Sequence, residues 1–123
     1  MVVLGYISAE IINTLGLDLS PGAPIYIGES NIRHMKKSHP EDYKRYRHLL
    51  KEILNDPDYV GINPSDQSIE FVKEIQMGDE FIKVAVRVSQ NGKHYARTLY
   101  KLNTRRTLNF IRDGKLLKID RKH

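Results

Sequence analysis

A chain of 123 residues supplies about one domain, which excludes most multidomain enzymes. Hydrophobic residues make up 40% of the chain and charged residues 28%, a balance typical of a folded, soluble domain rather than a disordered or membrane-spanning one. Cysteine is absent, so disulfide scaffolds, thiolate zinc sites and cysteine nucleophiles are excluded.

The charge is basic overall and unevenly distributed. Twenty Lys and Arg face 15 Asp and Glu, for a net charge of +5. Residues 97–123 hold nine basic residues against two acidic ones, and residues 33–51 hold seven against two. Two concentrated basic segments favour a polyanionic partner such as a nucleic acid, and the alternative is an ordinary solvated surface.

The first elements are short. Residues 2–7 form an apolar run, and Ser8 is a good cap for a helix that Gly16 ends. A loop over 17–24 and an extended piece over 25–27 follow. The apolar start has no basic flank and is too short to span a bilayer, so we expect no export or membrane segment and a cytoplasmic location.

The segment from about residue 30 to residue 55 predicts two helices. Ser30 or Asn31 caps a helix that runs toward Lys37. Pro40 suits the first turn of a second helix, and the helical spacing of apolar residues extends it to about Asn55.

From there the hydrophobic period changes to two. Gly78-Asp79 and Asn91-Gly92 are signals for two-residue hairpin turns. They separate three alternating segments at about 67–77, 80–90 and 93–102. The pattern predicts an antiparallel meander.

The chain closes with a helix that begins near Thr104 and ends before Gly114, and with a last strand at 116–119. We expect one α+β domain, with N-terminal helices packed on one face of a twisted antiparallel sheet. Within it, residues 1–24 form a lead-in and residues 25–119 the core.

The hairpins decide which side chains share a face of the sheet. A two-residue turn at Asn91-Gly92 predicts four cross-strand pairs on one face: Lys83–Tyr100, Ala85–Thr98, Arg87–Ala96 and Ser89–His94. A two-residue turn at Gly78-Asp79 places Glu70 beside Arg87 and Glu74 beside Lys83 on that face. Carboxylates, cations, an imidazole and hydroxyls are the groups needed for acid–base chemistry on a phosphodiester. The alternative is an ordinary polar face held by cross-strand ion pairs.

Two histidines form a second constellation. On one continuous helix, His34 and His39 would lie about 140° apart, which makes them poor co-ligands of a metal. Residues 38–40 predict a helix junction, however, and a kink there could bring both rings to one pocket. The positive end of the second helix would disfavour the charged form of His39, which suits a neutral base. The alternative is that each histidine is a cap or a surface residue.

Five short strings occur in a fairly specific order: Asn31-Ile32-Arg33-His34, Ser38-His39-Pro40-Glu41-Asp42-Tyr43, Leu50 to Ile53, Asp56-Pro57-Asp58-Tyr59-Val60 and Arg97-Thr98-Leu99-Tyr100. Together they resemble the phage-associated nucleases grouped with barnase, EndoU, colicin-type and RelE-like toxins, over about residues 25–119. The resemblance implies a BECR-like fold with four to five antiparallel strands. It also implies a metal-independent endoribonuclease without a cofactor.

The resemblance and the sheet face together give a candidate site. The family's motif falls on His34, His39, Thr98 and Tyr100, and the sheet face adds Lys83 and Arg87. Basic residues near these motifs are candidates for RNA binding: Lys36, Lys37, Arg97, Arg105 and Arg106. No metal site is expected.

The first functional hypothesis is therefore a phage or mobile-element toxin that cleaves tRNA or another cellular RNA. A base, His39 or His34, deprotonates a 2′-hydroxyl that attacks the adjacent phosphate, and the other histidine acts as acid. DNA is spared because it lacks the 2′-hydroxyl. Such a nuclease would need a cognate immunity protein or late expression. The second hypothesis is a non-catalytic basic module that binds RNA, or a structural component of a phage particle.

Overall fold

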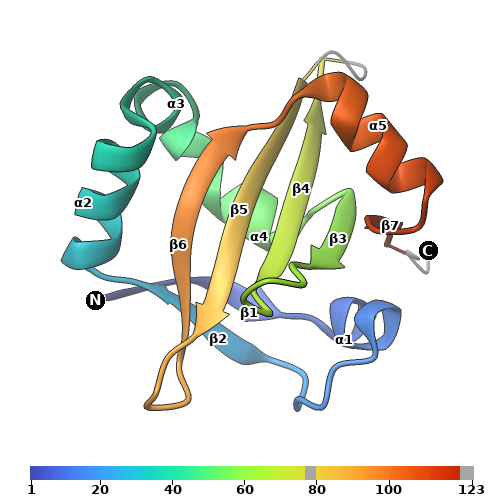
Figure 1. Cartoon of the computed structure of the whole chain (residues 1–123). Helices are drawn as coiled ribbons and strands as arrows, with labels where there is room; N and C mark the ends of the chain where they lie inside the picture. Colours follow the sequence, from blue (N-terminus) through green and yellow to red (C-terminus); the bar gives the residue numbers. More distant parts are fainter. Residues whose placement is uncertain (77–79, 120–123) are drawn as a thin grey trace.

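The computed structural model describes residues 1–76 and 80–119. Within these residues seven strands form one open sheet, in the order β1-β2-β6-β5-β4-β3-β7 (Figure 1). The strands are β1 (Val2–Ile7), β2 (Ala23–Ile27), β3 (Tyr59–Ile62), β4 (Ile69–Ile75), β5 (Glu80–Val88), β6 (His94–Lys101) and β7 (Leu117–Lys118). The helices are α1 (Ala9–Leu15), α2 (Glu29–Ser38), α3 (Pro40–Tyr46), α4 (Leu50–Asn55) and α5 (Thr104–Arg112).

The α+β class is as predicted, but the sheet has more strands than the four to five expected. The apolar run at the start is a full strand that pairs antiparallel with β2. The segment Tyr59–Ile62 is another, too short to show an alternating pattern of its own. The sheet is mixed, because β2 joins β6 in parallel through two residue pairs. None of the described helices is long and apolar enough to cross a membrane.

Local capping explains where the first helices begin and end. The Ser8 hydroxyl accepts a hydrogen bond from the backbone N–H of Ile11, and Gly16 ends α1 in the left-handed conformation at a φ of 66°. His39 has a φ of −143° and a ψ of 69°, outside the helical region. Pro40 disfavours a helical conformation in the residue before it, so α2 and α3 meet at a junction, as predicted.

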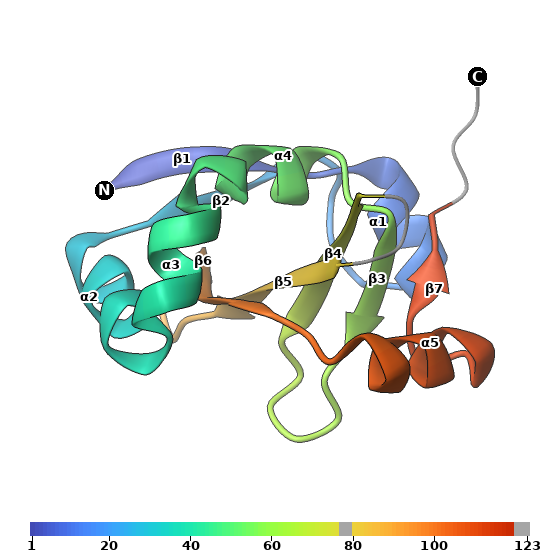
Figure 2. The same ribbon diagram turned by 90° about the horizontal axis from the view of Figure 1, so that it is seen from above.

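The predicted continuous helix to Asn55 is interrupted. A 3₁₀ turn at Arg47–Leu49 separates α3 from α4. The change of direction lets α4 pack between β1 and the central strands β4 and β5 (Figure 2). There α4 buries Leu50, Ile53 and Leu54. Helical spacing alone continues through such a turn and does not reveal it.

The main core lies between α4 and the sheet. Its fully buried members come from both ends of the chain and include Ile7, Ile11, Ile53, Phe71 and Leu99. Each such side chain contributes about 1.5–3 kcal/mol by leaving water. The lead-in segment supplies two of these five residues, so β1 and α1 are packed into the same core as the central strands.

A second, smaller core lies on the opposite face of the sheet. Val72, Phe81 and Leu116 are buried there, and the partly buried Phe110 of α5 packs against them. The chain after α5 crosses β3 closely: a Cβ on Gly61 would lie 2.6 Å from the carbonyl oxygen of Lys115. Only glycine leaves room for this crossing. The polar face of the sheet is therefore covered at one end by α5 and open elsewhere (Figure 1).

The β5–β6 hairpin agrees with the predicted register at one end only. Lys83–Tyr100 and Ala85–Thr98 pair as predicted, and then a β-bulge shifts the register by one residue. Beyond the bulge Arg87 faces Tyr95, and Val88 faces His94. The predicted pairs Arg87–Ala96 and Ser89–His94 are therefore wrong.

The cause of this error is the turn itself. The backbone N–H of Ser89 donates to the carbonyl of Lys93, and Gly92 has a φ of 81°. The connection thus has three residues between Ser89 and Lys93 instead of the two predicted, and the last of them is the glycine in the left-handed conformation. The one-residue bulge compensates, which restores the predicted pairing at Tyr100.

The β4–β5 pairing is displaced by two residues from the prediction. Glu70 faces Ala85, Val72 faces Lys83, and Glu74 faces Phe81. The predicted ion pairs Glu70–Arg87 and Glu74–Lys83 are therefore wrong. An even shift keeps every side chain on its predicted face. The turn that we predicted at Gly78-Asp79 lies outside the described residues.

Candidate active site

The central contact of the site joins a helix junction to the end of a strand. His39 lies between α2 and α3, and its ring stacks on that of Tyr100 near the end of β6. The ring centres are 4.5 Å apart and the planes differ by 22°. Offset stacking of this kind stabilises a fixed ring orientation. An aromatic partner thus holds one of the two predicted histidines over the predicted polar face.

A carboxylate ties α3 to the same strand end. Asp42, in the first turn of α3, accepts a hydrogen bond of 3.1 Å from the backbone N–H of Lys101. At this end β6 pairs with β5 but not with β2, whose pairing is confined to His94 and Tyr95. The N–H of Lys101 is therefore on an open strand edge that Asp42 covers. This bond joins the helix that begins after His39 to the residue that follows Tyr100.

An ion pair lies beside the stack. The Lys83 ammonium is 2.8 Å from the Glu70 carboxylate and 4.8 Å from the centre of the Tyr100 ring. The Lys83 and Glu70 side chains are only 12% and 17% exposed. Burial alone would lower the pKa of Lys83, but hydrogen bonds to Glu70 and Tyr100 outweigh it and raise that pKa above the ordinary lysine value. Lys83 therefore carries a positive charge at neutral pH.

A cavity extends from this ion pair to α5. Its volume is about 790 Å³, and Glu70, Lys83 and Tyr100 are among the residues that line it. Residues of α5 and of the segments around it line the rest, among them Asn103, Arg106 and Phe110. A ligand in the cavity would contact the charged Lys83 directly.

The remaining predicted catalytic residues lie at varying distances from this centre. Thr98 is half-buried on the same face as Tyr100, opposite Ala85. Arg87 is exposed farther along that face. His34 is exposed on α2, and its ring nitrogen lies 3.4 Å from the Ser38 hydroxyl. No contact in the described structure joins His34 to His39, Lys83 or Tyr100.

His94 does not belong to the polar face. The bulge turns it to the other side of the sheet, where it is buried and pairs with Ile25 of β2. Its burial lowers the pKa of the imidazole. We had placed His94 beside Thr98 and Tyr100, and that placement is wrong.

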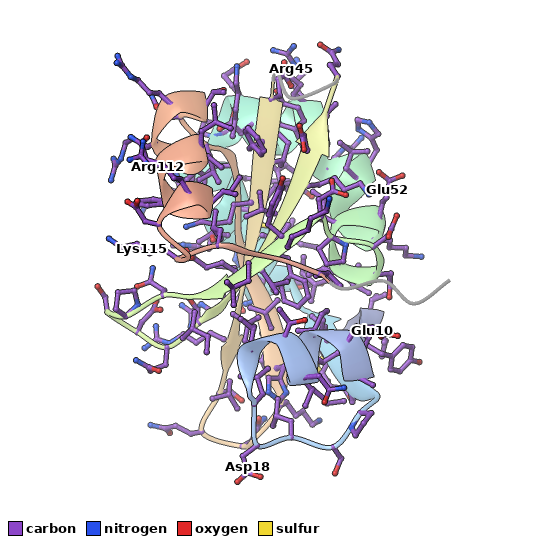
Figure 3. All side chains as sticks on the ribbon, turned by 90° about the vertical axis from the view of Figure 1, so that its right-hand side faces the viewer. Glu10, Asp18, Arg45, Glu52, Arg112 and Lys115 are labelled. Atoms are coloured by element: carbon purple, nitrogen blue, oxygen red, sulfur yellow. The ribbon has the colours of Figure 1, made fainter. Side chains whose placement is uncertain are left out.

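The predicted RNA-binding residues lie on both sides of the site. Arg106 lines the cavity and Arg105 is exposed beside it on α5, whereas Arg97 is exposed on β6. Lys36 and Lys37 are exposed in the last turn of α2. Figure 3 shows Arg112 and Lys115 on the side of α5, and Glu10 and Glu52 on the opposite side. Arg112 and Lys115 therefore lie on the same side of the molecule as α5, which lines the cavity.

Sequence reasoning missed two parts of the site. Asp42 appeared in the sequence only as part of the string Ser38 to Tyr43, which says nothing of its distant partner Lys101. The cavity wall on α5 was predicted only at Arg106, as a candidate for RNA binding, and the rest depends on where the helix packs. Within the described residues no group of three or more His, Asp or Glu could hold a metal ion.

The structure shows an α+β fold in which a histidine at a helix junction stacks on a tyrosine of the open sheet, beside a charged lysine. Residues 2–109 match the family described as phage-Barnase-EndoU-ColicinE5/D-RelE like nuclease3. The chain therefore belongs to this phage-related nuclease family, and the resemblance found in the sequence is confirmed. Comparison with curated proteins finds no match, and neither does comparison with solved structures.

Proposed function

We propose that this nuclease is an endoribonuclease whose active site is centred on His39, Tyr100 and Lys83. The observation that carries the proposal is the His39–Tyr100 stack beside a largely buried, charged lysine, with Tyr100 and Lys83 lining a large cavity. A fixed imidazole supports proton transfer at neutral pH, and a preorganised cation supports reactions that concentrate negative charge on phosphorus.

The proposed reaction is an internal transfer within RNA. His39 accepts the proton of a 2′-hydroxyl, and the oxygen attacks the adjacent phosphorus. Lys83 stabilises the charge that develops on the phosphoryl oxygens. The bond to the 5′-oxygen breaks, that oxygen takes up a proton, and the products are a 2′,3′-cyclic phosphate and a 5′-hydroxyl. The steps use side chains alone, so we propose that the activity needs no metal.

His34 is the second proposed proton-transfer group. It is exposed on α2 and lies outside the stacked cluster. We therefore expect its removal to cost less activity than removal of His39. Thr98 and Arg87 are proposed to contact the phosphate from the same sheet face, and Lys36, Lys37, Arg97, Arg105 and Arg106 to bind flanking phosphates.

The test is incubation of RNA with the purified protein in excess EDTA. We expect fragments that end in cyclic phosphate, their near-complete loss in His39→Ala, and a smaller loss in His34→Ala. His48→Ala is the matched control, since His48 is exposed on the 3₁₀ turn between α3 and α4. Single-stranded DNA of the same sequence should stay intact.

Two results would overturn the proposal. Equal activity of His39→Ala and wild type would remove His39 from the mechanism. Intact RNA that nevertheless binds in a salt-dependent way would instead support the alternative of a non-catalytic RNA-binding module.

In the cell we propose a toxin or effector role for a phage or mobile element, acting on cytoplasmic RNA such as tRNA. A cognate immunity protein would then protect the producing cell. Induced expression should arrest growth, and His39→Ala should abolish the arrest. If wild type and His39→Ala are equally toxic, the growth arrest does not depend on the proposed active site.

A further inference from the structure

The cavity beside α5 has the composition of a site for a flat, polar ring. Its walls include apolar side chains, and Phe110 of α5 is only partly buried by the second core. Two cations contact the Phe110 ring: the Arg106 guanidinium at 5.8 Å and the Lys115 ammonium at 5.5 Å from its centre. Within the described residues neither cation forms an ion pair. An aromatic face with unpaired cations around it is the usual setting for stacking a base close to a phosphate.

The rim of the cavity supplies hydrogen-bond donors. The Asn63 side-chain oxygen accepts from the backbone N–H of Ser65, and the Asn103 side-chain oxygen accepts from that of Arg106. Each asparagine lines the cavity, and its amide NH₂ has no partner in the described part of the chain. Backbone bonds thus fix both side chains with their donors unused. Such donors suit the carbonyl oxygens and ring nitrogens of a nucleobase.

The cavity is also the right size and in the right place. Ligand pockets span roughly 300–1,000 Å³, so 790 Å³ accommodates a nucleotide. Its lining includes Lys83 and Tyr100 of the sheet as well as Phe110 of α5. In Figure 3, α5, Lys115 and the loop between β3 and β4 lie on the same side of the molecule. A phosphate at Lys83 would therefore have its neighbouring base directed toward α5.

We propose that this cavity binds one nucleotide of the substrate, with the base against Phe110 and the donors of Asn63 and Asn103 reading its edge. The role in choosing the cleaved nucleotide rests on the proposed ribonuclease function, whereas the binding itself does not. The ligand class is a ribonucleoside monophosphate.

The test is titration of the whole chain with each of the four 3′-nucleoside monophosphates. Binding is monitored by NMR through the chemical shifts of the backbone amides. We expect the largest shifts at Phe110, Arg106 and Asn63. Phe110→Leu should weaken binding about tenfold, because it removes the stacking face while keeping an apolar side chain. Leu108→Ala is the matched control on the same helix, since Leu108 is 52% exposed and lies outside the cavity.

A second pair of variants avoids any effect on the core. Arg106→Ala should weaken nucleotide binding severalfold, while Arg112→Ala, also on α5 but outside the cavity, should leave it unchanged. Ribose 5-phosphate, which has no base, should bind at least tenfold more weakly than the nucleotides. Equal affinity of the base-free compound would overturn the proposal, as would equal binding by Arg106→Ala and Arg112→Ala.

The outcome is independent of the proposed catalysis, because these nucleotides contain no phosphodiester bond between nucleotides. If RNA is cut but Phe110→Leu binds nucleotides like wild type, the cavity proposal fails and the proposed function stands. If nucleotides bind in the cavity and RNA stays intact, the proposed function fails and the cavity is a nucleotide site of another kind.

Discussion

Among single residues, Glu70 has the clearest effect on the charge at the centre of the site. Its carboxylate is the ion-pair partner of the buried Lys83. Glu70→Gln leaves that ammonium without a counter-charge, so we expect a loss of about 1–3 kcal/mol in the free energy of unfolding at neutral pH. Glu74→Gln, two positions along the same face of β4, should change it much less. Urea unfolding of the three proteins measures the difference.

The same pair predicts a pH dependence. The folded pKa of Lys83 lies above its ordinary value of 10.5, so the pair's contribution to stability is fully present below pH 10.5. That contribution is lost as the pH rises through the higher folded pKa. The difference in the free energy of unfolding between wild type and Glu70→Gln should therefore stay constant from pH 7 to pH 9 and shrink above pH 10.5. A stability difference that widens at alkaline pH would contradict a raised pKa of Lys83 in the folded protein.

Between elements, the bond from Asp42 to Lys101 holds α3 against the end of β6. Asp42→Ala removes the acceptor, so we expect the ring of His39 to lose its fixed position over Tyr100. The ring-proton shifts of His39, which the Tyr100 ring current displaces, should move toward those of a free histidine. Activity on RNA should fall about tenfold or more, because small displacements of a catalytic group are costly.

Two variants separate positioning by Asp42 from a general effect of charge. Asp42→Asn keeps an oxygen that can accept from Lys101 and should retain most of the ring-current shift. Glu41→Ala removes a neighbouring exposed carboxylate and should change neither shift nor activity. An unaltered His39 signal in Asp42→Ala would show that the stack holds without the bond.

The elements also show what the sequence could predict. Caps are local, and so Ser8, Gly16 and Pro40 predicted helix ends correctly. The predicted cap of α2 at Ser30 or Asn31 is wrong, because α2 begins after Gly28, whose N–H donates to the Asn31 side chain inside the helix. Turn type depends on more than the dipeptide: Asn91-Gly92 favours a hairpin, yet here the loop is longer and a bulge restores the register. The partnership of Asp42 with Lys101 joins residues far apart in sequence, so no local pattern reveals it. His39 and Tyr100 were predicted as candidates because they belong to the family's motif, and Lys83 because it shares a face of the sheet with Tyr100. The cavity could not be predicted, because it depends on how α5 packs.

For the molecule as a whole, two basic and two acidic residues lie on opposite sides. Arg112 and Lys115 lie on the side of α5 and the cavity, and Glu10 and Glu52 lie on the opposite side (Figure 3). A polyanion should therefore approach from the cavity side and displace counterions there. Each phosphate contact on a single strand contributes about 0.7 to the slope of log affinity against log salt concentration.

This division predicts which charges control RNA binding. Removing two exposed basic residues of α5 in Arg105→Ala/Arg106→Ala, of which Arg106 lines the cavity, should lower the salt slope by about 1.4 if both contact phosphates. Glu10→Gln/Glu52→Gln changes as many charges on the far side and should leave the slope unchanged. Fluorescence anisotropy of a labelled RNA, with His39→Ala as the background to prevent cleavage, gives both slopes. If the two glutamate substitutions change the slope as much as the two arginine substitutions, then net charge controls RNA binding. The RNA would in that case not bind on one particular side of the molecule.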